Sequence, residues 1–108
     1  MRQRKLPFRL VYDVAVTQHL APIARKYHAL IRETIKEQLC YEPEAETRNR
    51  KPLIRPTEFG ATWELRFGPK NRFRVFYEPD QRLHQVNILA IGVKEGNILS
   101  IGGEEYEL

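Results

Sequence analysis

The chain has 108 residues, of which 42% are hydrophobic and 30% are charged, and these values predict one globular domain over residues 1–108. A single cysteine excludes a disulfide framework and a zinc site built from several thiolates. The longest apolar run has the length of a strand, far below the ~20 residues of a membrane-spanning helix, and charged residues interrupt the N-terminus where a signal peptide would be apolar. These features predict a soluble cytoplasmic protein that does not enter a membrane.

The charge is distributed unevenly along the chain. Residues 1–94 contain all 18 basic residues and ten of the 14 acidic ones, which gives this part a formal charge of +8. Residues 95–108 contain four glutamates and no basic residue, a charge of −4. A body this basic attracts polyanions, either nucleic acid or an acidic protein, although an ordinary solvated surface of mixed charge would have the same composition.

Hydrophobic periodicity predicts a strand and then helix in the first 42 residues. Residues 7–16 alternate in polarity, which predicts a strand with one buried face, and Thr17 is a candidate N-cap for a helix after it. Apolar residues then recur in steps of three and four, which predicts one helix, or two helices with a break near residue 24 or 25, ending before Pro43. The members of the apolar stripe are Leu20, Ile23, Ala24, Tyr27, Ile31, Ile35 and Leu39.

The second half of the chain predicts a sheet. Residues 42–61 show neither the alternation of a strand nor the spacing of a helix, and they contain three prolines, which predicts a long loop. Strands are expected over residues 62–68, 72–78 and 83–93, with turns at 68–71 and 79–80, so the strands form an antiparallel meander to which the tail can add a short edge strand. The fold class is therefore α+β: an N-terminal strand, a helix or helical hairpin, and a twisted antiparallel sheet of three to four strands.

A candidate site lies on the sheet face turned away from the helices. The simplest hairpin register pairs Phe67 with Phe73, and this places Arg66 directly opposite Arg74. Opposed like charges destabilise a sheet, which predicts an anion bound between the two arginines, unless these side chains only keep exposed strands soluble. Strand alternation puts the following residues on this face: Glu64, Arg66, Arg72, Arg74 and Phe76.

Further basic residues surround this face in the prediction. Arg48, Arg50, Lys51 and Arg55 lie close together in the expected loop, where they either follow a phosphate backbone or are neutralised by the glutamates at 42, 44 and 46. Lys94 follows the last long strand at the rim of the same face. The three histidines show no metal-ligand spacing, so neither a metal nor a cofactor is predicted.

Five stretches of the chain, taken in order, resemble the RelE/ParE superfamily, the toxins of bacterial type II toxin–antitoxin modules. They are ETRNRKPL (46–53), WELRFG (63–68), FRVFYE (73–78), ILAIGVKEGN (88–97) and IGGEEYEL (101–108). The resemblance implies a RelE-like fold, a role in plasmid stabilisation and an acidic antitoxin partner that wraps over the basic surface. It implies a metal-independent endoribonuclease that cuts mRNA on the ribosome and inhibits translation. A ParE-like inhibitor that binds DNA gyrase, or a diverged relative without toxicity, remains open.

Resemblance to the ribonuclease branch also implies residue roles. Arg74 would contact the scissile phosphate, with Arg66 and Lys94 as further cations. Glu64 and Arg66 stand where the best-known pattern has two lysines, and Ser100 stands where it has a tyrosine. The candidate proton acceptors are Glu64, Lys51 and Lys94. The expected catalytic set is Arg66, Arg74, Lys94 and Glu64, and the expected RNA-binding set is Arg48, Arg50, Lys51, Arg72 and Phe76, the last as a platform for stacking a base.

Overall fold

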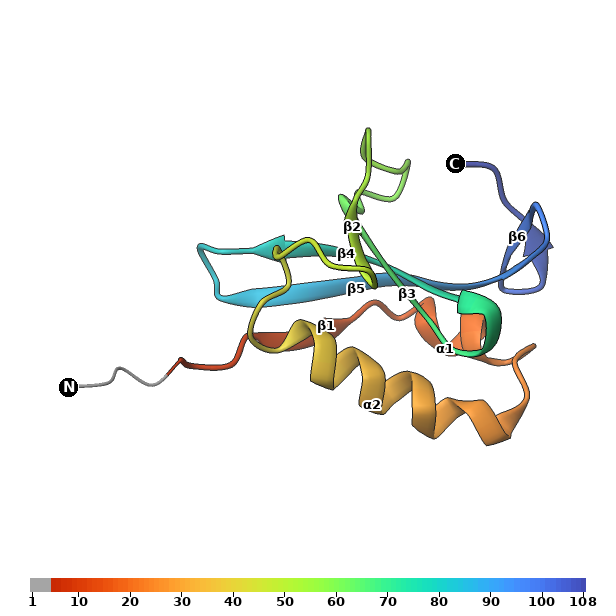
Figure 1. Cartoon of the computed structure of the whole chain (residues 1–108), viewed down its shortest axis with the longest axis horizontal. Helices are drawn as coiled ribbons and strands as arrows, with labels where there is room; N and C mark the ends of the chain where they lie inside the picture. The colour runs from red at the N-terminus through yellow and green to blue at the C-terminus, as the bar shows by residue number, and fades with distance from the viewer. Residues whose placement is uncertain (1–4) are drawn as a thin grey trace.

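A computed structural model describes residues 5–108, and in it the helices pack against one face of a seven-stranded sheet (Figure 1). The predicted α+β class is therefore confirmed, although the sheet has more strands than expected. None of the helices in the described residues is long and apolar enough to cross a membrane. The elements are β1 (Arg9–Tyr12), α1 (Val16–Leu20), a 3-10 turn (Arg25–Tyr27), α2 (His28–Leu39), β2 (Arg50–Pro52), β3 (Trp63–Phe67), a second 3-10 turn (Pro69–Asn71), β4 (Phe73–Asp80), β5 (Gln85–Glu95), β6 (Ile98–Ile101) and β7 (Glu104–Glu105).

The helical region contains two helices joined at a corner, the second of the two predicted alternatives. Ala24 has an extended backbone with ψ of 134°, which separates α1 from the 3-10 turn and α2. The Nε2 atom of His28 lies 3.0 Å from the carbonyl oxygen of Leu20 and 2.8 Å from that of Ile23, so the imidazole bridges the corner. The expected N-cap at Thr17 is wrong: α1 begins at Val16, and Thr17 lies inside it.

The first strand, β1, is shorter than the alternating pattern predicts. The Asp13 carboxylate accepts the backbone N–H of Ala15 at 2.9 Å and turns the chain into α1. Val14 is consequently 91% exposed, and the predicted buried face of residues 7–16 is wrong at this position. β1 pairs in parallel with β5, from Arg9 opposite Gln85 to Tyr12 opposite Ile88. No local signal in the sequence predicts this pairing.

The antiparallel meander of β3, β4 and β5 is confirmed, together with the predicted register of its first hairpin. Phe67 pairs with Phe73, and Arg66 pairs with Arg74. Gly68, with φ of 82°, begins the turn between them in a conformation that residues with a Cβ rarely adopt. The loop predicted over residues 42–61 is interrupted by the three-residue strand β2, which pairs antiparallel with β3. The tail contributes both β6 and β7.

The main core lies between the helices and the sheet, as the apolar stripe predicts. Ile31, Ile35 and Leu39 of α2 are buried in this core, whereas Ala24 is exposed. A smaller core covers part of the opposite sheet face, where residues 53–61 and the tail fold back over the strands. Its buried members are Ala61, Phe76, Ala90 and Leu99, with Phe59 and Tyr106 packed against them. The sheet face turned away from the helices is therefore partly covered.

Candidate functional site

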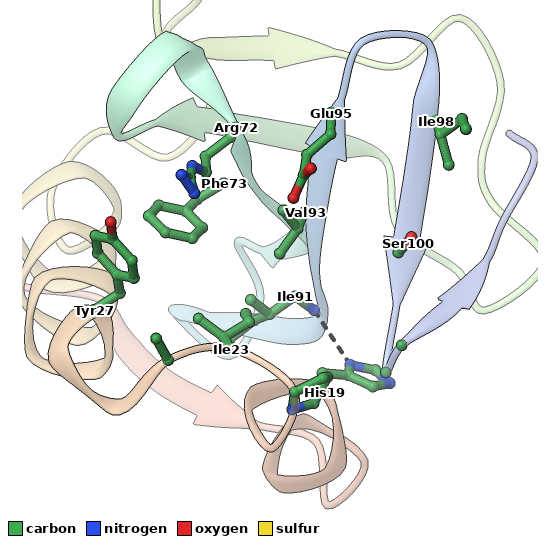
Figure 2. A pocket seen from close by; sticks show the side chains of 14 residues that line it. His19, Ile23, Tyr27, Arg72, Phe73, Ile91, Val93, Glu95, Ile98 and Ser100 are labelled. Atoms are coloured by element: carbon green, nitrogen blue, oxygen red, sulfur yellow. Dashed lines mark hydrogen bonds between the residues drawn. The ribbon is translucent and has the colours of Figure 1, made fainter.

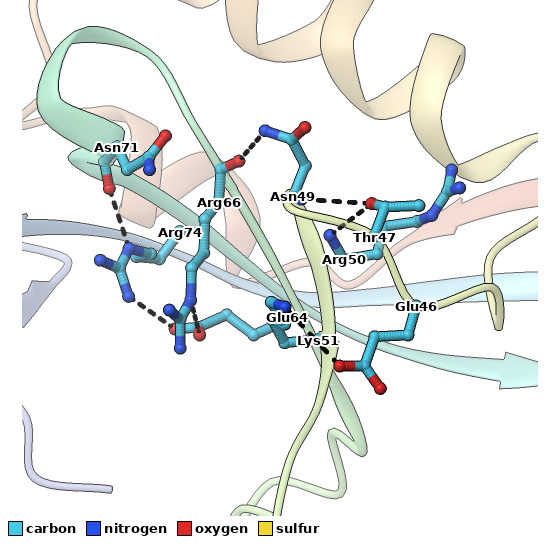
Figure 3. A network of polar contacts seen from close by, with 9 residues as sticks. All are labelled: Glu46, Thr47, Asn49, Arg50, Lys51, Glu64, Arg66, Asn71 and Arg74. Carbon is cyan, nitrogen blue, oxygen red and sulfur yellow. Dashed lines mark hydrogen bonds and ion pairs between the residues drawn. The ribbon is translucent and has the colours of Figure 1, made fainter.

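The register of the strands gathers basic side chains on the sheet face opposite the helices (Figure 3). Lys51 of β2 lies across from Glu64 of β3, and Arg66 of β3 lies across from Arg74 of β4. Lys94 of β5 pairs with Leu99, which belongs to the smaller core, so Lys94 lies on the same face. The structure thus brings together four basic residues of the predicted site from four strands.

A single carboxylate joins the two arginines at the centre of this face. The Nε atom of Arg66 donates to Oε1 of Glu64 at 2.6 Å, and Nη1 of Arg74 donates to Oε2 at 3.3 Å (Figure 3). The Glu64 side chain is 3% exposed, against 11% for Arg74 and 40% for Arg66. The carboxylate of Glu64 therefore occupies the space between the opposed arginines where the sequence predicts a bound anion.

The remaining hydrogen-bonding capacity of the two arginines is unequal. Arg74 also donates from Nε to the carbonyl oxygen of Asn71 at 2.9 Å. The terminal nitrogens of Arg66 donate no hydrogen bond to residues 5–108, and its side chain is the more exposed of the two. After neutralisation by Glu64 the pair keeps one net positive charge, and Arg66 presents it to solvent.

The start of β2 is fixed against β3 by backbone and side-chain bonds. The backbone N–H of Arg66 donates to the carbonyl oxygen of Asn49 at 2.8 Å, and Nδ2 of Asn49 donates back to the Arg66 carbonyl at 2.7 Å. The Thr47 hydroxyl accepts the backbone N–H groups of Asn49 and Arg50. Lys51 extends over the same face with its Nζ atom 3.6 Å from the Glu46 carboxylate.

Arg50 does not belong to this surface. Its register partner is Leu65 of the main core, so its side chain lies on the helix side of the sheet and is buried. The guanidinium donates to the carbonyl oxygens of Gln38 and Ala45 at 2.6 and 2.8 Å, which ties β2 to the end of α2. The structure therefore does not place Arg50 on the surface where it is expected to bind RNA, whereas Arg48, two residues earlier, is exposed.

Two further expectations need correction. Phe76 lies on the predicted face, opposite Glu64, but it is fully buried in the smaller core, so it offers no surface for stacking a base. Arg72 precedes β4 with helical backbone angles, which break the alternation of the strand. Its guanidinium lies 5.5 Å from the ring centroid of Tyr27, on the helix side of the sheet.

Arg72 lines a pocket of about 540 Å³ between α1, the corner of the helices and the strands β4 to β6 (Figure 2). On the opposite wall, the Nδ1 atom of His19 accepts the backbone N–H of Ile91 at 3.2 Å. Ile91 lies on β5 between the stretch paired with β1, which ends at Ile88, and the stretch paired with β6, which begins at Gly92. No strand of the described part of the chain pairs with this edge N–H, so His19 caps it, and burial lowers the pKa of His19. Nothing in the sequence pattern indicates this contact.

The donors of the cationic face are of the kind that contact phosphate groups in proteins, but the face has few groups for proton transfer. In the cluster of Lys51, Glu64, Arg66 and Arg74, both oxygens of the only carboxylate accept bonds from arginines. Lys51 and Lys94, the other two predicted candidates for proton transfer, also lie on this face. Among residues 5–108, no group of three or more His, Cys, Asp or Glu side chains is arranged to hold a metal ion.

Comparison with solved structures identifies a likeness over most of the chain. No protein-family model and no curated protein sequence matches the chain. A chain in the crystal structure of the toxin–antitoxin complex RelBE2 from Mycobacterium tuberculosis superposes with a TM-score of 0.67 and 24% sequence identity, over 86% of this chain and 98% of that one. The two proteins share their fold over almost the whole of the known chain. The protein described here therefore has the RelE-like fold that its sequence motifs predict.

Proposed function

We propose that this protein is the toxin of a type II toxin–antitoxin module and that it cleaves mRNA on the ribosome. The observation that carries the proposal is the cationic face of β2 to β5, on a fold shared with a chain of a toxin–antitoxin complex. On this face the terminal nitrogens of Arg66 donate no hydrogen bond to residues 5–108, and Lys51 lies on the neighbouring strand. Guanidinium groups form two-point contacts with phosphate oxygens, which suits RNA as the ligand. Such a toxin would act in the cytoplasm and would be neutralised by an acidic antitoxin bound to the same basic surface.

The proposed reaction requires no metal. The 2′-hydroxyl oxygen forms a bond to the adjacent phosphorus, and the bond from phosphorus to the 5′ oxygen of the next nucleotide breaks. The products are a 2′,3′-cyclic phosphate and a 5′-hydroxyl, with one proton lost from the attacking oxygen and one gained by the leaving oxygen. Arg66 would stabilise the additional negative charge of the transition state, and Lys51 and Lys94 are the candidates for proton transfer.

A second candidate is inhibition of DNA gyrase by protein binding. It is favoured by the two hydrogen bonds that Glu64 accepts from Arg66 and Arg74. A face whose central carboxylate is bound in this way is better suited to binding than to acid–base catalysis. In this case Arg66 and the neighbouring lysines would contact acidic residues of the partner.

An experiment in cells separates the candidates. The protein is expressed from an inducible promoter, the 5′ ends of mRNA are mapped after induction, and plasmid supercoiling is measured in the same cultures. New mRNA ends within translated regions, with unchanged supercoiling, support the ribonuclease. Loss of negative supercoiling with intact mRNA supports the gyrase inhibitor, and growth without either change contradicts both proposals and supports a non-toxic relative.

A further inference from the structure

We infer that Glu64 is a positioning residue that holds Arg66 with its terminal nitrogens outward, and that Arg66 rather than Arg74 makes the direct contact with an RNA phosphate. The inference rests on the proposed function, since it describes how the same face binds RNA. It reverses the roles that the sequence motifs imply, in which Arg74 is the phosphate contact and Glu64 a candidate proton acceptor.

Glu64 stays between the two arginines when an anion binds. Its side chain is 3% exposed, and its two oxygens accept one charge-assisted hydrogen bond each, from Arg66 and Arg74. An incoming phosphate that displaced this carboxylate would leave it buried without a cationic partner, which is among the costliest changes in a protein interior. The phosphate must therefore bind to nitrogens that Glu64 leaves free.

Arg74 has few free hydrogen-bond donors for such a ligand. Its Nε atom donates to the carbonyl oxygen of Asn71, its Nη1 atom donates to Glu64, and its side chain is only 11% exposed. Two of its three nitrogens are thus engaged within the protein. Arg74 acts as the inner support that balances the charge of the buried carboxylate.

Arg66 has the opposite arrangement. Among the described residues, 5–108, only its Nε atom donates a hydrogen bond, at 2.6 Å to Glu64, and its side chain is 40% exposed. Two hydrogen bonds to Asn49 fix the backbone of Arg66, and this limits where its side chain can lie. Both terminal nitrogens of the guanidinium remain available, and together they form the edge that binds two phosphate oxygens in parallel. Lys51, across from Glu64 on β2, adds a second cation beside this edge.

The first test is spectroscopic and uses the unmodified protein. The ¹⁵N–¹H signals of the arginine Nε–H groups are assigned and then followed during titration with a short single-stranded RNA whose riboses carry 2′-O-methyl groups, which prevents cleavage. We expect the Arg66 signal to shift with RNA while the Arg74 signal stays in place. Movement of the Arg74 signal alone would overturn the inference.

The second test measures the affinity of four variants for the same RNA, with the fold of each checked by urea denaturation. Arg66→Lys should weaken binding about tenfold or more, because one charged hydrogen bond is lost, and Arg74→Lys should weaken it much less. Glu64→Gln should also weaken binding, although it removes a negative charge, because Arg66 loses its anchor. Glu58→Gln is the matched control: it removes the same charge from an exposed residue that forms no ion pair within residues 5–108, and it should leave binding equal or slightly tighter.

The outcomes distinguish this inference from the proposed function. If Glu64→Gln tightens binding as much as Glu58→Gln does, or if only Arg74→Lys weakens binding, the positioning role is wrong while RNA binding stands. If the unmodified protein does not bind the RNA, the ribonuclease proposal and this inference fail together.

Discussion

Arg66 and Arg74 are direct cross-strand partners, and their guanidinium groups are joined through the carboxylate of a third residue, Glu64. Without this carboxylate, two like charges would face each other across β3 and β4, an arrangement that destabilises a sheet. The negative charge of Glu64 therefore balances part of the positive charge of the two arginines. This balance makes the stability of the hairpin depend on a residue of the candidate site.

The first prediction concerns that dependence. Glu64→Gln should lower the free energy of unfolding by about 1–3 kcal/mol, less than the ~3–5 kcal/mol for breaking a fully buried ion pair, because Arg66 is partly solvated and its charge is screened. Urea denaturation measures the change. Glu46→Gln, which removes the partner of Lys51 in an exposed pair, should change stability far less. Equal effects of the two substitutions would contradict the buried role of Glu64.

The second prediction tests the packing of α2 on the sheet. Ile35 is fully buried in the main core, so Ile35→Ala should cost about 2–5 kcal/mol of stability through lost burial and the cavity left behind. Leu30 lies on the same helix but is 43% exposed, and Leu30→Ala should cost clearly less. A denaturation midpoint that Ile35→Ala leaves unmoved would argue against the observed orientation of the helix.

The third prediction separates two arginines that are two residues apart. Arg50→Ala should lower stability by about 1–3 kcal/mol, because the carbonyl oxygens of Gln38 and Ala45 lose a buried cationic donor. Arg48→Ala should leave stability nearly unchanged, because this residue is exposed, and should weaken binding to RNA. Thermal denaturation and RNA titration of both variants check the contrast. If Arg50→Ala weakens RNA binding as Arg48→Ala does and leaves stability unchanged, Arg50 contacts RNA and the buried role is wrong.

The fourth prediction is a pH dependence centred on His19. Only the neutral imidazole can accept the backbone N–H of Ile91 at Nδ1, and burial lowers the pKa of His19 from 6.5, with Asp13 opposing the shift in part. The unfolded chain therefore takes up this proton first as the pH falls, so the contribution of His19 to stability is complete above pH 6.5 and declines below it.

The measurement is urea denaturation as a function of pH for the protein and for His19→Gln. The variant should lose stability less steeply below pH 6.5 than the unmodified protein, and an NMR titration should place the midpoint of the His19 ring below 6.5. Parallel stability profiles for the two proteins would show that His19 is not responsible.

The sequence predicts the parts of this fold that depend on neighbouring residues. The turn at residues 68–71 joins two alternating segments, so the pairing of Phe67 with Phe73 follows from local geometry. The parallel pairing of β1 with β5 is not predictable in this way, because Arg9 and Gln85 are 76 residues apart and no crossover pattern marks the pair. β2 is missed because three residues ending in proline carry no periodicity.

The candidate site is predictable in outline, and its details depart from the prediction for identifiable reasons. Alternation places Glu64, Arg66 and Arg74 on one face, but the sequence does not show that Glu64 itself fills the space between the arginines. A Glu-x-Arg pair on one strand, facing an arginine on the next, is the signal that would have indicated it. Phe76 is misjudged because residues 53–61 and the tail cover it, and segments of irregular structure cannot be placed from periodicity.

The position of β1 has a consequence for how the chain reaches its native state. β3, β4 and β5 are consecutive and can associate through short turns, whereas β1 and the apolar stripe of α2 have no surface to pack against until those strands exist. Contacts between residues this far apart close late and slow the search for the folded structure. While the chain is being synthesised, Ile31, Ile35 and Leu39 are exposed for as long as the sheet is unfinished. The segment from β1 to the end of α2 is therefore the one through which aggregation or proteolysis can remove newly made protein before it folds.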